Sequence, residues 1–177
     1  MTTEQTDPKA TARTNKPVAW DERSTLTNHL DYARRTAWEK CAGVSAEHAV
    51  AAPLPGSPLM SLWGLISHLR WVEHWWFDVI FLGNEDEGPW TDEDPDREMR
   101  VVDGVPIDAV IAEYAEKCVA WDALVARTDL DALAVRPLGD GRQPTMRWVL
   151  MHLVEEIARH NGHLDILREL ADGTTGD

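Results

Sequence analysis

The segment HLVEEIARHNGHLDILR, residues 152–168, decides the fold because a helical apolar pattern and metal-binding side chains coincide in it. At 3.6 residues per turn, the apolar residues in and just before it fall on one face, namely Val149, Leu153, Ile157, Leu164 and Leu167. Glu156 and His160 stand four residues apart, so they are neighbours on that side of the helix. Because a buried carboxylate without a partner is costly, this pair requires a hydrogen-bonded base or a metal ion.

Three further segments with helical apolar spacing precede this one. Together the predicted helices span approximately residues 21–42, 60–82, 106–127 and 145–171. Asp21 or Ser24 is expected to cap the first helix and Thr145 the last, while Gly43 and Gly173 follow helix ends. No alternating strand pattern competes with them. The sequence therefore predicts an all-α protein, a four-helix bundle.

A long acidic connection, residues 84–105, joins the second and third predicted helices. Charge runs of this kind usually form solvated surface loops, and we expect one here. Its length also allows it to cross the whole bundle, so that helices two and three can be parallel neighbours. We expect a disordered N-terminal tail over residues 1–19, a single bundle domain over 20–172, and a C-terminal tail over 173–177.

Composition narrows the function classes. The chain has 177 residues, 44% of them hydrophobic, which suits one domain with a sizeable core. A net charge of −14 argues against nucleic-acid binding. The longest apolar stretch is interrupted by charged residues, which argues against a membrane span. Cys41 and Cys118 lie in helical patterns and are expected to be small core residues in a cytoplasmic protein.

His68 is the candidate third ligand. It lies at the flank of the core-facing arc of the predicted helix 60–82, from where it would face the last helix across the bundle axis. Bundles build metal sites from side chains on facing helices, and a set of two histidines and one glutamate matches catalytic zinc sites. We therefore predict that His68, Glu156 and His160 bind a divalent ion, zinc being expected and nickel or manganese the alternatives.

Other histidines compete for the same role. His152 is about 12 Å along the helix from His160, which is too far for both to bind one ion. His163 is one turn beyond His160, and whether it replaces Glu156 as a ligand stays open at this point. The remaining histidines are expected on the surface or in loops, namely His29, His48 and His74.

Nine tryptophans are many for a chain of this length. Four of them point to several sides of the predicted second helix, so one core cannot bury all of them: Trp63, Trp71, Trp75 and Trp76. We expect Trp76 in the core, and Trp75, which adjoins His68 on the helical wheel, in a pocket. The surplus also suits a subunit contact, so a homodimer is an expectation.

Two segments carry a resemblance to a known family: SLWGLISHLRWVE, residues 61–73, and EEIARHNGHLDILRE, residues 155–169. Over about residues 20–172 the chain resembles the DinB superfamily, in particular its actinobacterial branch of mycothiol-dependent enzymes. The resemblance implies a four-helix bundle with a long crossover between helices two and three, and a divalent metal held at the positions of His68, Glu156 and His160. Many members have histidine where Glu156 stands; the glutamate resembles the variant in mycothiol-dependent maleylpyruvate isomerases.

The resemblance also implies a reaction class. A thiol-dependent S-transferase or isomerase would hold the sulfur of mycothiol as thiolate for attack on a small electrophile. The expected partners are thus a small-molecule thiol and an electrophile, and Arg159, beside the motif, is a candidate cofactor-binding residue. The alternatives are a non-enzymatic metal-binding stress or interaction protein and a metal-dependent hydrolase, so whether the chain is an enzyme stays open.

Overall fold

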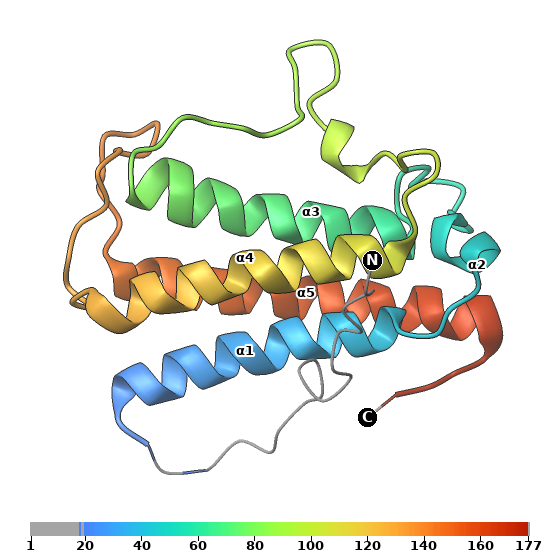
Figure 1. Ribbon diagram of the computed structural model, residues 1–177, viewed down its shortest axis with the longest axis horizontal. Coiled ribbons are helices and arrows are strands. Elements are labelled where there is room, and N and C mark those ends of the chain that lie inside the picture. The colour runs from blue at the N-terminus through green and yellow to red at the C-terminus, as the bar shows by residue number, and fades with distance from the viewer. Residues whose placement is uncertain (1–17, 19, 177) are drawn as a thin grey trace, which may run out of the picture.

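The computed structural model describes residues 18 and 20–176, and its long helices form a four-helix bundle (Figure 1). The predicted all-α fold is confirmed. The disorder expected for residues 1–19 concerns almost entirely residues outside the described part. The long helices are α1 (Glu22–Cys41), α3 (Leu62–His74) with its π-helical continuation η2 (Trp75–Phe81), α4 (Ile107–Arg127) and α5 (Met146–Asp172). Two short helices join them, α2 (Ala46–Val50) and the 3₁₀ helix η3 (Arg97–Met99).

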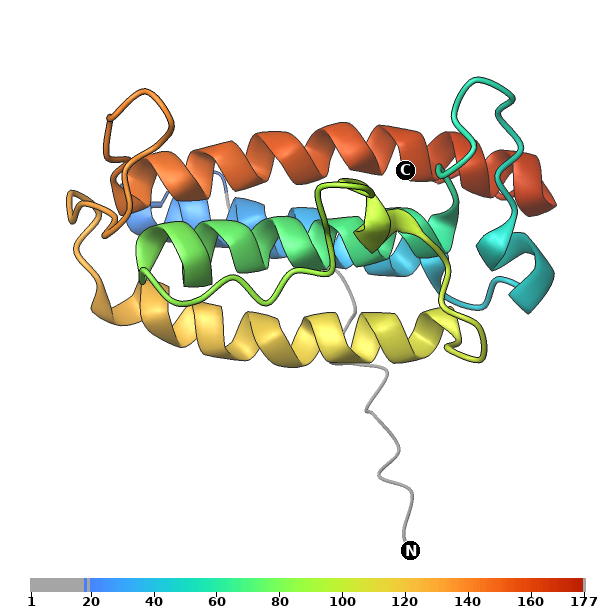
Figure 2. The ribbon, with the colours of Figure 1, turned by 90° about the horizontal axis from the view of Figure 1, so that it is seen from above.

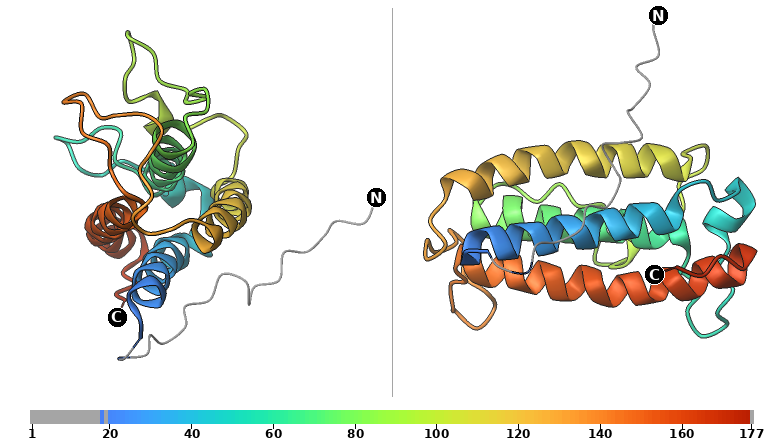
Figure 3. Two further views of the ribbon diagram at one scale, coloured as in Figure 1. Left: turned by 90° about the vertical axis from the view of Figure 1, so that its left-hand side faces the viewer. Right: turned by 90° about the horizontal axis from the view of Figure 1, so that it is seen from below.

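The order of the helices in the bundle follows from the long crossover. In Figure 1, α1 and α5 run in one direction and α3 and α4 run in the other. The end-on view in Figure 3 shows α3 diagonally opposite α1, with α4 and α5 on either side. Because α3 and α4 are parallel, residues 82–106 must return along the length of the bundle, and Figure 2 shows them passing along α3. The predicted crossover and parallel pair are confirmed.

The helix ends follow the local sequence. Asp21, not Ser24, caps α1, because its carboxylate accepts the backbone N–H of Ser24 at 3.0 Å. Thr145 caps α5 as predicted by accepting the N–H of Trp148 at 3.2 Å. Gly173 ends α5 with a φ of 76°, a left-handed conformation that favours glycine.

The core lies between the four long helices and includes the predicted apolar face of α5. Five side chains of that face are at most 3% exposed: Val149, Leu153, Ile157, Leu164 and Leu167. Cys41 and Cys118 are also buried, and burial raises the pKa of both thiols. Among the described residues, the helices include none that combines the length and the apolar character needed to cross a membrane.

The π-helix η2 departs from the predicted regular helix. Its last turn is closed by a hydrogen bond from Leu82 N–H to Phe77 C=O at 3.0 Å, which spans five residues. A wider turn rotates the following side chains away from their positions on a regular wheel. Trp76, expected in the core, is only half-buried: it packs against the edge of the core beside Trp148, while Trp63 of α3 is 3% exposed.

A buried ionic cluster that no sequence pattern predicted joins three helices. Arg34 of α1 is 1% exposed and donates from Nε to Glu73 of α3 at 2.8 Å. Tyr114 of α4 donates its hydroxyl to the same carboxylate. Arg34 also pairs with Asp122 at 2.8 Å. The charge of Arg34 on α1 is therefore compensated by carboxylates on α3 and α4, and these contacts favour one relative position of the three helices.

Candidate metal centre

The structure brings the three predicted ligands together across the contact of α3 with α5. Candidate donor atoms of His68, Glu156 and His160 all lie within 4.8 Å of one another. The Nε2 atom of His160 is 3.2 Å from Oε1 of Glu156, and Nε2 of His68 is 4.0 Å from the same oxygen. It is the one group of at least three such side chains found among the described residues.

The surroundings leave the cluster accessible on one side. The side chains of His68 and Glu156 are each 20% exposed, and that of His160 is 14% exposed. Ile157 and Leu164, on the same helix as two of the ligands, are fully buried and hold that part of α5 against the core. An ion bound here would thus have protein ligands on the core side and room for another ligand on the open side.

Burial adjusts one of the ligands for metal binding. Desolvation lowers the pKa of His160 below its ordinary value, and the neighbouring His68 lowers it further, while Glu156 acts in the opposite direction. The lowered pKa favours the neutral imidazole, which is the form that binds a metal.

Glu98, which the sequence analysis assigned to a solvated acidic loop, is buried beside His68. Its side chain is 7% exposed, and its Oε1 atom is 3.0 Å from Nδ1 of His68. An ionised carboxylate only accepts hydrogen bonds, so it favours the tautomer with the proton on Nδ1 and the lone pair of Nε2 directed at Glu156. Metal-binding histidines usually have such a carboxylate or carbonyl partner. The expectation of solvation is therefore wrong for this residue.

Gly64 explains how the crossover comes so close to α3. A Cβ atom at this position would lie 2.6 Å from the backbone oxygen of Met99, the residue after Glu98. Any larger residue would push η3 outward and take Glu98 away from His68, one turn further along α3. Because glycine destabilises a helix interior, an isolated glycine inside a helical pattern indicates a packing constraint, and it was the available sequence signal.

Two other predicted candidates lie next to the cluster. His163 contacts His160 through their Nδ1 atoms, 3.3 Å apart, and does not belong to the group of three candidate ligands. Arg159 is 60% exposed, and its guanidinium lies 3.7 Å from Glu156 and 3.4 Å from Glu155. Arg159 is thus at the solvent side of the cluster.

The other histidines of this region lie outside the cluster. His152 stacks on Trp148 with ring centroids 4.9 Å apart, consistent with its expected exclusion as a ligand. His74 was expected on the surface, and this is wrong, because it is 5% exposed. Its Nε2 accepts the N–H of Glu87 at 3.3 Å, so Nδ1 carries the proton and donates to Asp78 at 3.0 Å. Its burial follows from the crossover packing against α3.

The donor set fits a divalent ion. Both histidines direct Nε2 at one oxygen of Glu156, and two nitrogens with one carboxylate suit zinc and its neighbours in the first transition row. The second oxygen of Glu98 is buried and accepts no hydrogen bond from any described residue. The carboxylates of Glu98 and Glu156 therefore lie on the two sides of the His68 ring, and a bound cation would balance their negative charge.

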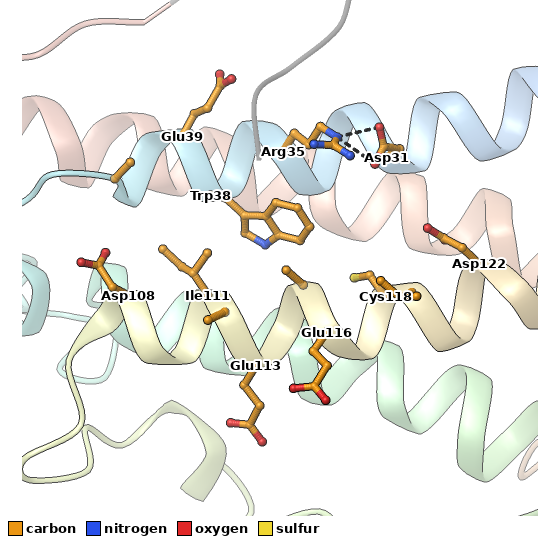
Figure 4. A pocket seen from close by; sticks show the side chains of 14 residues that line it. Asp31, Arg35, Trp38, Glu39, Asp108, Ile111, Glu113, Glu116, Cys118 and Asp122 are labelled. Atoms are coloured by element: carbon orange, nitrogen blue, oxygen red, sulfur yellow. Dashed lines mark hydrogen bonds and ion pairs between the residues drawn. The ribbon is translucent and has the colours of Figure 1, made fainter. Parts of the chain in front are cut away.

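Of two cavities in the bundle, one adjoins the site and a larger one lies away from it. Trp75, the predicted pocket residue, is 37% exposed and lines a cavity of about 310 Å³ that adjoins His68 and Glu98. A larger cavity of about 750 Å³ lies between α1 and α4, with Trp38 and Cys118 in its wall (Figure 4). The candidate ligands come from α3 and α5, so this larger cavity does not include them.

Comparison with known proteins agrees with the fold and the cluster. A sequence profile described as mycothiol-S-transferase matches residues 25–173. This range contains the three candidate ligands and all four long helices except the first three residues of α1. No match was found among curated proteins. The match confirms the resemblance to the mycothiol-related branch of the DinB superfamily. The chain belongs to the mycothiol S-transferase family.

Proposed function

We propose that this protein is a metal-dependent S-transferase that joins mycothiol to a small electrophile, with His68, Glu156 and His160 as the metal ligands. The observation that carries the proposal is the half-open cluster of two imidazoles and a carboxylate, with a cavity beside it. Membership of the mycothiol S-transferase family supports the thiol as co-substrate. Zinc is the expected ion, with nickel and manganese as alternatives.

The residues of the chain have separate tasks in this proposal. A divalent ion bound by His68, Glu156 and His160 would lower the pKa of a coordinated thiol and so supply a thiolate at neutral pH. Glu98 keeps the Nε2 lone pair of His68 directed into the cluster, and burial lowers the pKa of His160, which favours its neutral form. The core side of the cluster is closed, so thiol and electrophile both approach from the exposed side, where Arg159 lies. We assign Arg159 to contact with the thiol co-substrate.

The test is thiol consumption by the metal-loaded protein. Mycothiol and a model electrophile should react faster with the zinc-loaded protein than with chelator-treated protein, and zinc addition should restore the rate. His160→Ala should abolish the increase, whereas His29→Ala, which changes an exposed histidine of α1, should retain it. A rate equal to that of the metal-free protein with several different electrophiles would contradict the proposal.

A metal-dependent hydrolase is the second candidate, because the same open side admits water, and metal-bound water is a nucleophile near neutral pH. An assay without mycothiol separates the two functions. A hydrolase would still turn over an activated ester, whereas a transferase would no longer turn over its electrophile. A non-enzymatic metal-binding protein would do neither, and the cavity next to the cluster favours an enzyme. The cytoplasmic location and the homodimer stay predictions.

A further inference from the structure

Four of the seven residues that line the cavity beside His68 are tryptophans. Its walls are Trp71, Trp75 and Trp76, which follow one another along α3 and η2, together with Val72 and Trp90. Its remaining lining residues are His68 and Glu98, a candidate metal ligand and its hydrogen-bonding partner. We call these seven residues the tryptophan pocket. A ligand in it would therefore be next to the reacting centre of the proposed function.

The indole rings are arranged at steep angles. The ring of Trp90 stands at 72° to that of Trp71 and at 77° to that of Trp75, with centroids 6.0 and 6.1 Å apart. The guanidinium of Arg70 covers the ring of Trp71 at 4.3 Å. Trp75 keeps 37% of its surface exposed. A flat ring entering the pocket can therefore meet both edges and faces of indoles, the two contacts that aromatic pairs prefer.

Two polar groups of the pocket are already paired within the protein, and Oε2 of Glu98 is a buried acceptor that receives no hydrogen bond from any described residue. The Nε1 of Trp90 donates to Asp86 at 2.7 Å, and Nδ1 of His68 is paired with Glu98. Sugar-binding sites combine an aromatic platform with several free donors and acceptors for hydroxyl groups, whereas the lining here is mainly apolar and Oε2 of Glu98 is its one buried acceptor without a hydrogen bond from a described residue. A flat apolar group satisfies the pocket better than the hydroxyl-rich rings of mycothiol do.

From this geometry we infer that the tryptophan pocket binds the aromatic part of the electrophile, so that the protein transfers thiol to aromatic or similarly flat apolar electrophiles. This inference rests on the proposed function, for which it names the substrate class. A volume of about 310 Å³ suits a compound of one or two fused rings rather than an extended one. The thiol then occupies the more polar exposed side of the cluster near Arg159.

The crossover completes this pocket through Trp90. Its ring packs on Gly88, where an added Cβ would collide with the indole. Gly88→Ala therefore displaces Trp90 without removing an aromatic side chain, and Trp90→Ala removes it. Trp75→Ala removes the indole that contacts Trp90 edge to face. Trp20→Ala is the matched control, because Trp20 is an exposed indole just before α1 and does not line the pocket.

A binding experiment tests the pocket independently of turnover. Isothermal titration calorimetry would measure the Kd of the zinc-loaded protein for 1-naphthalenemethanol, a neutral and unreactive flat probe. Trp75→Ala, Trp90→Ala and Gly88→Ala should each raise that Kd about tenfold or more, and Trp20→Ala should leave it unchanged. Equal Kd values in wild type and pocket variants, or displacement of the probe by millimolar inositol, would overturn the assignment.

A kinetic experiment then tests the substrate class. With mycothiol fixed, kcat/KM would be compared for 1-chloro-2,4-dinitrobenzene and for the small aliphatic electrophile iodoacetamide. In each reaction a C–S bond replaces the carbon–halogen bond, chloride or iodide leaves, and the thiol proton goes to solvent. The pocket variants should lose about tenfold with the aromatic electrophile and less than twofold with iodoacetamide. Equal losses, or a rise confined to the KM of mycothiol, would overturn the inference. If the wild type shows no thiol transfer at all, the proposed function fails, while the calorimetry still decides the pocket.

Discussion

The Nδ1 atom of His68 and the Oε1 atom of Glu98 are 3.0 Å apart, although 30 positions separate the two residues in the chain. One belongs to a bundle helix and the other to the crossover that gives the bundle its helix order. The crossover thus has two roles: it allows α3 and α4 to run parallel, and it orients a candidate metal ligand. It also provides Trp90 to the tryptophan pocket. Changes in the crossover should therefore alter metal binding while the bundle persists.

Glu98→Gln should weaken metal binding about 10- to 100-fold, the usual effect of changing the carboxylate partner of a metal-binding histidine. The amide keeps the shape of the side chain but loses the charge that stabilises the Nδ1 proton of His68. Competition with a chelator of known affinity measures the change in Kd. Glu93→Gln, at an exposed glutamate of the same crossover, should bind metal like the wild type. Equal affinities of both variants would show that Glu98 has no influence on the ion.

Substitutions of the two neighbouring histidines of α5, His160 and His163, should identify which of them binds the ion. His160→Ala should remove bound zinc from the purified protein, because it deletes one of three donors. His163→Ala should retain about one equivalent, because His163 contacts His160 but lies outside the group of candidate ligands. Elemental analysis of the two variants, each confirmed as helical by circular dichroism, measures this. Loss of zinc only in His163→Ala would transfer the role of ligand to that residue.

Features that depend on the pattern of a single helix could be predicted from the sequence. The apolar spacing of α5 predicted both its buried face and the adjacency of Glu156 to His160, and the cap at Thr145 followed from its position before that pattern. The flank position of His68 on its helix was enough to place it across from α5. In each of these cases, periodicity and residue type determine the outcome.

Features that depend on contacts between distant segments were not predictable in this way. Glu98 has the same chemistry as its exposed neighbours in the crossover, and it is buried because Gly64 admits η3 close to α3. Arg34 and Glu73 interrupt apolar patterns like ordinary surface charges, yet they neutralise each other inside the bundle. The π-helical turn after His74 is likewise invisible to a pattern that assumes a constant 100° per residue.

Glu73→Gln should destabilise the bundle by about 3–5 kcal/mol, the typical cost of removing one partner of a buried ion pair. The amide leaves the guanidinium of Arg34 with Asp122 as its remaining carboxylate, and the latter is 59% exposed. Urea unfolding followed by circular dichroism measures the difference. Glu155→Gln, at an exposed glutamate of α5, should change stability by less than about 0.5 kcal/mol. Similar unfolding midpoints for the two variants would contradict a stabilising role of the buried pair.

Asp78 should make stability depend on pH in the acidic range. Burial alone would raise its pKa, but hydrogen bonds from His74 and Trp121 outweigh burial, so the pKa is lowered. A carboxyl group with a lowered pKa contributes stability above its unfolded value near 3.9, and the contribution is lost as the pH falls through the folded value. Asp78→Asn should therefore be less stable than the wild type by about 1 kcal/mol at pH 7.

The quantity to follow is the difference in unfolding free energy between the wild type and Asp78→Asn, because many other carboxylates also titrate in this pH range and affect both proteins. Urea unfolding of both at several pH values between 7 and 3 should show a constant gap down to about pH 4 and a smaller one below it. A gap that stays constant to pH 3 would mean that the ionisation of Asp78 does not stabilise the fold.

The two cysteines should be inert in the native protein. Cys41 is fully buried and Cys118 is 4% exposed, and burial raises the pKa of each, so neither forms the reactive thiolate at pH 8. Ellman's reagent should label neither in the folded protein within minutes and both, two per chain, in urea. In the proposed function the attacking sulfur is therefore that of the co-substrate and not that of a protein thiol. Cys41→Ala should accordingly retain thiol transfer, and a variant that folds and binds zinc but has lost transfer would show that a protein thiol takes part.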